Sequence, residues 1–267
     1  DFNKPRIMGV LNVTPDSFYD GGYYYDQDSL NKRLKQLKEE GADIIDVGGY
    51  SSRPGADHIS REEEWKRLEP VLKKISADFP EFIVSVDTFR SEIARNAVKE
   101  YNVDMINDIS AGEMDEKMFE TIAELQVPYI MMHMKGTPQN MKEMAVYDDM
   151  MDEILRYFSR KYDQLRNMGV KDVILDPGFG FAKNIEHNFL LINKLEQFKI
   201  FELPLLVGIS RKSMIFRTLN INPQEALNGT TVLNTIALLQ GADILRVHDV
   251  KEAKEVIQLI QKVQNAQ

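Results

Sequence analysis

Short apolar runs alternate with amphipathic segments along the whole chain, and this alternation constrains the fold more than any other feature. Each run has the composition of a buried strand, and the segments between the runs have apolar residues at the 3.6-residue spacing of a helix. Strands that are apolar throughout and are separated by helices are typical of a parallel sheet covered by helices. The eight runs occupy residues 6–13, 43–49, 82–88, 104–110, 128–134, 173–178, 205–210 and 244–250.

Eight strand and helix pairs in a chain of 267 residues predict an α/β fold, the (β/α)8 TIM barrel. We expect a single barrel domain over residues 1–267, because no linker, low-complexity tract or shift in composition divides the chain. A doubly wound open sheet shows the same alternation and is the alternative at this point.

The composition favours a cytoplasmic protein. The chain has no cysteine, which excludes disulfides and thiolate metal sites and fits a reducing compartment. We expect no membrane association, since the chain has neither a leader-like start nor a segment of roughly 18 apolar residues. The net charge of −9 argues against a nucleic-acid partner, which would need a basic surface. Any anionic ligand must therefore be bound by local cations.

Charged side chains stand at the ends of several predicted strands, where an unpaired charge in a core would be unfavourable by several kcal/mol. In a barrel these ends converge on one mouth, where catalytic residues gather. We therefore expect the side chains to line a common pocket, and their mutual repulsion implies a ligand with several N–H groups or a metal. The alternative is that each residue only caps the next helix. The residues are Asp46, Asp87, Asp108, Asp176 and the pair Arg246 and His248.

Two predicted loops are long enough to be functional lids, residues 12–27 and 49–61. Arg53 places a cation in the second loop. The run GISRKSMI at 208–215 leads from the seventh strand into a helix, whose first N–H groups favour an anion. Further donors are expected there from Arg211, Lys212 and Ser213.

Seven motifs together resemble those of the dihydropteroate synthase family. They occur in the family's order over nearly the whole chain, and they are specific as a set. The resemblance implies a (β/α)8 barrel enzyme that joins p-aminobenzoate to the pyrophosphate ester of 6-hydroxymethyl-7,8-dihydropterin, forming dihydropteroate and pyrophosphate on the folate route. The motifs are LNVTPDSF at 11–18, DIIDVGGYSSRPGA at 43–56, SVDT at 85–88, IND at 106–108, DPGFGFAK at 176–183, SRKSM at 210–214 and RVHDV at 246–250.

The resemblance also implies roles for individual residues. A carboxylate can accept two hydrogen bonds from the 2-amino-4-oxo edge of a pterin, which is the role implied for Asp176, and the Arg246 guanidinium is implied to stack on the ring. The other implied pterin-binding residues are Asp87, Asn107, Gly208 and Lys212. The implied pyrophosphate-binding residues are Asn12, Arg53, Arg246 and His248, with a Mg²⁺ cofactor coordinated partly through Asn12.

The implied reaction is dissociative: the C–O bond breaks first, and the aniline nitrogen then attacks a pterin-stabilised methylene cation. The implied catalytic residues are Phe18, Asp20 and Lys212. The implied p-aminobenzoate site, where sulfonamides would compete, consists of Ser52, Pro54, Lys212 and Ser213. Ser52 departs from the threonine usual in the family, keeping the hydroxyl and losing a methyl group. The family further suggests a homodimer.

Two other functions fit parts of this pattern. A pterin-binding methyltransferase domain acting on a methylated folate uses a related barrel, but it has no pyrophosphate for Arg53, Arg246 and His248 to bind. A barrel that only binds pterin is the second alternative. His133 ends the fifth predicted strand, and a hydrogen-bonded structural role is favoured for it over a contact in the mouth.

Overall fold

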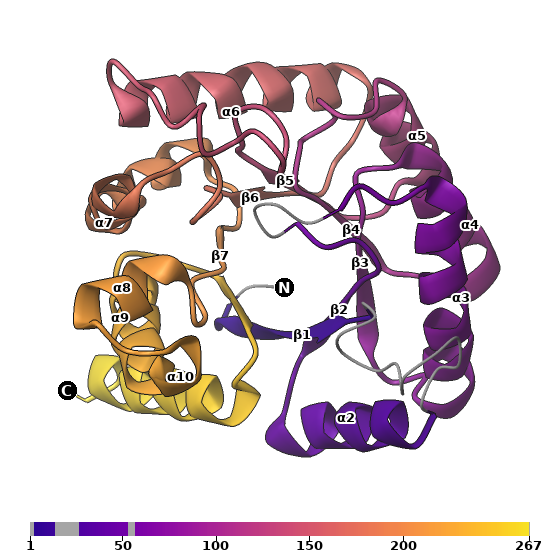
Figure 1. Ribbon diagram of the computed structural model, residues 1–267, viewed down its shortest axis with the longest axis horizontal. Helices are drawn as coiled ribbons and strands as arrows, with labels where there is room; N and C mark the ends of the chain where they lie inside the picture. The colour runs from indigo at the N-terminus through magenta and orange to yellow at the C-terminus, as the bar shows by residue number, and fades with distance from the viewer. Residues whose placement is uncertain (1–2, 14–26, 53–56, 267) are drawn as a thin grey trace.

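The strands of the computed structural model form one parallel sheet curled into a barrel (Figure 1). The structure describes residues 3–13, 27–52 and 57–266. The strand order is β6-β5-β4-β3-β2-β1-β8-β7, which pairs the first strand with the last, so the predicted barrel is confirmed and the doubly wound sheet is excluded. The strands are β1 (Arg6–Asn12), β2 (Ile44–Gly48), β3 (Ile83–Asp87), β4 (Met105–Asp108), β5 (Tyr129–Met132), β6 (Val173–Asp176), β7 (Leu206–Val207) and β8 (Ile244–Val247).

The barrel closes between β6 and β7 through a narrow contact. Leu175 and Leu205 form an isolated parallel bridge, and the Leu175 N–H donates to the Pro204 carbonyl at 2.9 Å. Pro177 follows β6 and has no N–H with which to extend a ladder. The strand β7 is therefore much shorter than the apolar run that predicts it.

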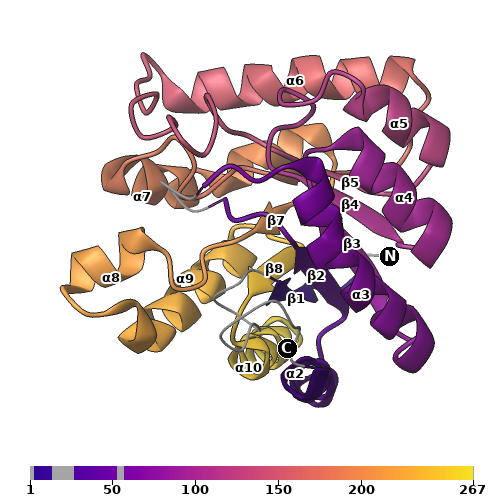
Figure 2. The same cartoon turned by 45° about the vertical axis from the view of Figure 1, so that its right-hand side comes forward.

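Helices follow the strands and surround the sheet, as Figures 1 and 2 show. Their apolar faces pack on the outer faces of the strands in one large cluster. No helix in the described ranges is long and apolar enough to cross a bilayer. The helical elements are α2 (Gln27–Glu40), α3 (Arg61–Asp78), α4 (Ser91–Tyr101), α5 (Met118–Leu125), α6 (Met150–Asn167), α7 (Ile185–Asn193), η1 (Leu195–Phe201), α8 (Ser213–Leu219), η2 (Pro223–Glu225), α9 (Leu227–Leu239) and α10 (Val250–Gln264).

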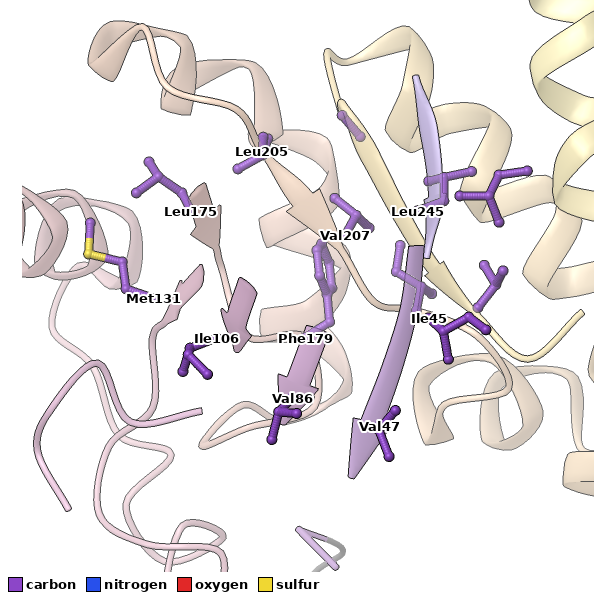
Figure 3. Close-up of a cluster of buried hydrophobic side chains, with 14 of the residues drawn as sticks. Ile45, Val47, Val86, Ile106, Met131, Leu175, Phe179, Leu205, Val207 and Leu245 are labelled. Atoms are coloured by element: carbon purple, nitrogen blue, oxygen red, sulfur yellow. The ribbon is translucent and has the colours of Figure 1, made fainter. Parts of the chain in front are cut away.

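Strand side chains alternate between the helix-facing and the barrel-facing side. Those on the helix-facing side, such as Ile45, Val86 and Val207, join the apolar cluster drawn in Figure 3. Those that enter the barrel near the strand starts form a separate apolar plug. The plug consists of Met8, Ile44, Met105, Ile130, Ile174, Leu206 and Ile244.

On several strands the next barrel-facing residue after the plug, toward the C-terminal end of the strand, is polar. Because facing repeats every second residue along a strand, each plug residue is followed two positions later by another inward residue. On β2, β4, β6 and β8 these residues are Asp46, Asn107, Asp176 and Arg246. On these four strands the plug therefore ends the apolar core, and their polar side chains form a layer between the plug and the mouth of the barrel.

Candidate active site

The buried carboxylate of Asp46 organises this polar layer. It accepts hydrogen bonds from Ser85 Oγ at 2.6 Å, Asn107 Nδ2 at 3.0 Å and Arg246 Nε at 2.7 Å. The contacts link β2 to β3, β4 and β8. Because Asp46 holds the amide nitrogen of Asn107, the amide oxygen is left as an acceptor for another molecule. Asp46 itself is fully buried, so it supports the layer rather than lining its surface.

Two carboxylates hold the Arg246 guanidinium. Besides its contact with Asp46, Arg246 donates through Nη2 to Asp87 Oδ2 at 2.9 Å. Burial lowers the pKa of Arg246, but the two carboxylates outweigh burial and the net shift is upward. Burial raises the pKa of Asp87 to about 7, although Arg246 opposes this. A carboxylate whose pKa is raised although a cation lies beside it is a feature common in functional sites.

Asp176 and Lys212 form the second charged group of the mouth. Asp176 Oδ1 accepts from the Gly178 N–H at 2.8 Å, and Lys212 Nζ donates to the Phe179 carbonyl. Burial raises the pKa of Asp176, an effect that Lys212 opposes, and burial lowers the pKa of Lys212 to about 8. Lys212 Nζ also lies 4.9 Å from the centroid of the Phe181 ring. Asp176 and Lys212 are thus both hydrogen-bonded to the backbone of the loop that follows β6.

Two glycines keep the mouth open. A Cβ at Gly208 would lie 3.8 Å from the Cβ of Arg246. A Cβ at Gly48 would lie 3.6 Å from Asn12 Oδ1 and 3.7 Å from Asp87 Oδ2. The missing side chains therefore leave space for a flat group beside Arg246 and for a small polar group between Asn12 and Asp87.

His248 and Ser213 stand at the rim on the side of β7 and β8. His248 Nδ1 lies 3.0 Å from Ser210 Oγ, and Arg33 Nη2 donates to the His248 carbonyl at 3.0 Å. Burial, followed by the Arg246 charge, lowers the pKa of His248, although the residue is exposed to solvent. The lowered pKa favours the neutral imidazole before a ligand binds.

Several predicted site residues belong to the two long loops. Ser52 is half-buried and is the last described residue before a gap at 53–56. The others lie outside the described residues, and their roles stay predictions. They are Phe18, Asp20, Arg53 and Pro54.

Comparison with known proteins identifies the family. A family described as pterin binding enzyme matches residues 8–248. The chain is 44% identical to the dihydropteroate synthase of Escherichia coli, over 100% of this chain and 94% of that protein. This chain belongs to the dihydropteroate synthase family.

Solved dihydropteroate synthases have the same fold over the full chain. A Yersinia pestis enzyme with a sulfonamide drug complex superposes with a TM-score of 0.93 at 40% identity, covering 100% of this chain and 96% of that one. A Xanthomonas albilineans enzyme with 4-aminobenzoic acid superposes with a TM-score of 0.92 at 35% identity, covering 100% and 95%. The barrel is therefore that of a dihydropteroate synthase from end to end.

The prediction that Asp108 faces the mouth is wrong. Its carboxylate lies on the helix-facing side of β4, where it accepts from Tyr129 Oη at 2.7 Å and from the Ser110 and Gly112 N–H groups at 2.7 and 2.8 Å. Asn107 precedes it and enters the barrel, so strand alternation turns Asp108 the other way. Asp108 therefore stabilises the β4–α5 loop of this dihydropteroate synthase fold.

The prediction that Arg211 supplies a donor for an anion is also wrong. Arg211 forms a two-pronged ion pair with Asp249, in which Nε to Oδ2 and Nη2 to Oδ1 are both 2.9 Å. Its remaining nitrogen donates to the Pro223 and Gln224 carbonyls at 3.2 and 2.6 Å. Arg211 therefore ties the β7–α8 loop to the start of α10, and Lys212 supplies the cation of the mouth.

Reasoning from sequence missed Lys183, which ends the DPGFGFAK motif. Its Nζ lies 3.0 Å from His133 Nδ1, and both residues are buried. This contact bears out the hydrogen-bonded structural role predicted for His133. The only signal for Lys183 in the sequence is its place in the motif, because nothing in the spacing shows that the side chain folds back under its own loop.

Proposed function

We propose that the protein acts as a dihydropteroate synthase, which condenses p-aminobenzoate with 6-hydroxymethyl-7,8-dihydropterin pyrophosphate in folate biosynthesis. The observation that carries this proposal is the gathering of Asn107, Asp176 and Arg246 in one polar layer at the mouth. Relatives named dihydropteroate synthase, aligned over the whole chain, support the same activity independently.

The polar layer suits a pterin ring in one orientation. In the proposed complex, Asp176 accepts from the 2-amino-4-oxo edge, while Lys212 donates to the ring carbonyl. The Asn107 amide oxygen accepts from another ring N–H, and its nitrogen is already fixed by Asp46. The guanidinium of Arg246 stacks on the ring where Gly208 leaves space. Asp87 completes the set, so a ring that lacks these donors would leave buried groups unpaired.

The pyrophosphate is proposed to lie further out, along Asn12, Arg246, His248 and Arg53. Mg²⁺ suits this place because it keeps several waters and takes one or two protein oxygens together with phosphate oxygens. Its proposed protein ligand is Asn12 Oδ1, which borders the space that a side chain at Gly48 would fill. Over residues 3–13, 27–52 and 57–266, no three His, Cys, Asp or Glu side chains are grouped as a metal ion would need. When bound, Mg²⁺ neutralises charge on the leaving group.

The proposed reaction is dissociative. The C–O bond breaks with its electron pair going to pyrophosphate, and the pterin ring stabilises the remaining methylene cation. The aniline nitrogen then attacks the cation and releases a proton, so no side-chain nucleophile is needed. Phe18 and Asp20, which belong to the first long loop, are proposed to shield and stabilise the cation.

The p-aminobenzoate is proposed to bind near Ser52, Pro54, Lys212 and Ser213. Helix α8 begins at Ser213, and its N-cap residue, Lys212, makes no side-chain hydrogen bond to the first N–H groups, which suits a carboxylate. Lys212 lies at the N-cap position and adds a positive charge. Sulfonamides are proposed to compete here.

An apolar face on α9 and α10 supports the proposed homodimer. The side chains on this face are large, exposed and spaced three or four residues apart. Helices α9 and α10 pack against each other (Figure 1), so the exposed residues stand on neighbouring helices. Leu239→Lys is expected to shift the protein to monomer in analytical ultracentrifugation. The residues are Val232, Ile236, Leu239, Leu259 and Val263.

A turnover assay tests the proposal. The protein is incubated with pterin pyrophosphate, p-aminobenzoate and Mg²⁺, and pyrophosphate is measured. Release that depends on p-aminobenzoate supports the synthase. Pterin binding without release would favour the binding-only barrel, and methyl transfer from a methylated folate to a corrinoid would favour the methyltransferase domain.

Two variants locate the site in the same assay. Asp176→Ala is expected to abolish pterin binding, because it removes the acceptor for the ring edge. Ser52→Ala is expected mainly to raise the KM for p-aminobenzoate. Asp172→Ala, an exposed change on the same segment, serves as the control. Full activity of Asp176→Ala would refute the assignment of the pocket.

A further inference from the structure

Lys183 is a buried basic side chain that no step of the proposed reaction uses, and burial lowers its pKa to about 7, an effect that Asp176 opposes. It is 8% exposed, and its Nζ lies 3.0 Å from His133 Nδ1 and 3.1 Å from both the Gly178 and Phe181 carbonyl oxygens. An ammonium group has three N–H donors, so the three acceptors match them one for one. A buried charge is unfavourable unless such partners compensate for it. This match indicates that the ammonium group itself has a role.

The partners of Lys183 define the shape of the loop between β6 and α7. Two of its acceptors are carbonyls of that loop, and both turn inward although loop backbone usually faces water. The backbone is left-handed at Gly178, with φ of 73°, and at Ala182, with φ of 47°. A left-handed alanine is unfavourable, so surrounding contacts must hold this conformation.

Helix α7 supports the same loop from its other side. The Gly180 N–H donates to Asn188 Oδ1 at 2.7 Å, and Asn188 Nδ2 donates to the Lys183 carbonyl at 3.3 Å. The loop is therefore held between an ammonium group on its inner side and an amide on its outer side.

The loop in turn supports the two charged groups on this side of the mouth. The Gly178 N–H donates to Asp176, and the Phe179 carbonyl accepts from Lys212. Loss of the loop conformation would therefore release both side chains, while Arg246 would keep its own carboxylates on β2 and β3.

We propose that Lys183 is a positioning residue for pterin recognition: its ammonium group fixes the β6–α7 loop, and the loop orients Asp176 and Lys212. This inference rests on the proposed function, because it assigns a support to the pterin site. Burial lowers the pKa of His133 well below its ordinary value, so the neutral imidazole accepts from Lys183 at Nδ1 and carries its proton on Nε2.

Two probes separate the ring site from the rest of the mouth. Calorimetry measures the binding of 6-hydroxymethyl-7,8-dihydropterin and, separately, of inorganic pyrophosphate with Mg²⁺. Lys183→Met is expected to weaken pterin binding at least tenfold and to change pyrophosphate binding less than twofold. Lys171→Met, an exposed control two residues before β6, is expected to change neither. Equal losses for both probes, or no loss for the pterin, would overturn the inference.

Chemical rescue distinguishes the contribution of the ammonium group from that of the aliphatic part of the side chain. The chain has no cysteine, so Lys183→Cys introduces a unique thiol. Alkylation of the unfolded variant with 2-bromoethylamine, followed by refolding, rebuilds a lysine-like ammonium, and alkylation with bromoethane adds the carbon atoms alone. Pterin binding is expected to return only with the ammonium. Equal binding by the two alkylated proteins would overturn the role of the charge.

A second variant covers the case in which Lys183 variants do not fold. Asn188→Ala loosens the loop from its outer side and is expected to show the same selective loss of pterin binding. If it binds both probes normally, the loop does not position the site and the inference fails. The proposed function is judged separately, by turnover of the unaltered protein.

Discussion

Replacement of Asp46 separates the charge of the central carboxylate from its hydrogen bonds. Asp46→Ala removes the acceptor for Ser85, Asn107 and Arg246 at once. It leaves the Arg246 guanidinium with Asp87 as its one remaining carboxylate partner in the described part of the mouth. Removing one partner of a buried ion pair is unfavourable by about 3–5 kcal/mol. We expect the free energy of unfolding to fall by that amount.

Asp46→Asn is expected to be much milder. Oδ2 of Asp46 accepts from both Asn107 and Arg246, whereas Oδ1 accepts from Ser85. An asparagine whose amide oxygen takes the place of Oδ2 keeps the first two bonds, and its NH₂ group donates to the Ser85 hydroxyl, which rotates to accept. Only the charge is lost, and the difference between charged and neutral hydrogen bonds is about 1 kcal/mol.

Urea unfolding of both variants measures this difference, provided that the m-value is unchanged. Asp172→Asn, at an exposed position, is the control and is expected to change stability by less than about 0.5 kcal/mol. In binding, Asp46→Asn is expected to hold pyrophosphate with Mg²⁺ at least as tightly as the unaltered protein, because Arg246 faces one negative charge fewer. Equal destabilisation by asparagine and alanine would refute the reasoning.

Three further changes test other parts of the site. Gly178→Ala is expected to destabilise the fold by roughly 1–3 kcal/mol or more in thermal unfolding, because the residue is left-handed and a Cβ would overlap the His133 carbonyl oxygen; a neutral result would contradict the loop geometry. The kcat/KM for pterin pyrophosphate is expected to fall about tenfold per pH unit above pH 8, because Lys212 has its pKa lowered to about 8 and loses its proton there; a flat profile up to pH 9.5 would show that its charge is not needed. Tyr129→Phe is expected to lower stability by about 1–3 kcal/mol through the bond lost to Asp108, with pterin affinity unchanged.

The barrel could be predicted from sequence because local patterns determine it. Each strand in the structure lies within one of the apolar runs, and the alternation with helices allows few other arrangements. The length of β7 could not be predicted, since it depends on the partner strand: Pro177 ends the ladder on β6, and β7 has little left to pair with on that side. Strand length is thus partly a tertiary property.

Strand alternation predicts which side chains at the strand ends enter the barrel. Asn107 and Asp108 are adjacent, so they cannot both enter the barrel, and the sequence alone contained the reason why Asp108 does not. The role of Asp46 required the structure, because its three donors come from other strands. The role of Lys183 could not be predicted for a different reason. It depends on the conformation of a loop in which Ala182 is left-handed, and an alanine in the sequence does not indicate that conformation.

The charge balance of the mouth explains why the ring and the leaving group need different parts of the protein. In the described part of the mouth, Arg246 is already paired with Asp46 and Asp87, and Lys212 is attracted by the Asp176 carboxylate. A neutral pterin can enter this balanced layer by exchanging hydrogen bonds. Pyrophosphate adds several negative charges that the layer does not neutralise, and the lowered pKa of His248 disfavours a further cation there. The additional positive charge must then come from above the layer, which is where the proposed Mg²⁺ and Arg53 would act. The buried polar layer would select the pterin ring, and the groups of the rim and loops would assist the departure of pyrophosphate.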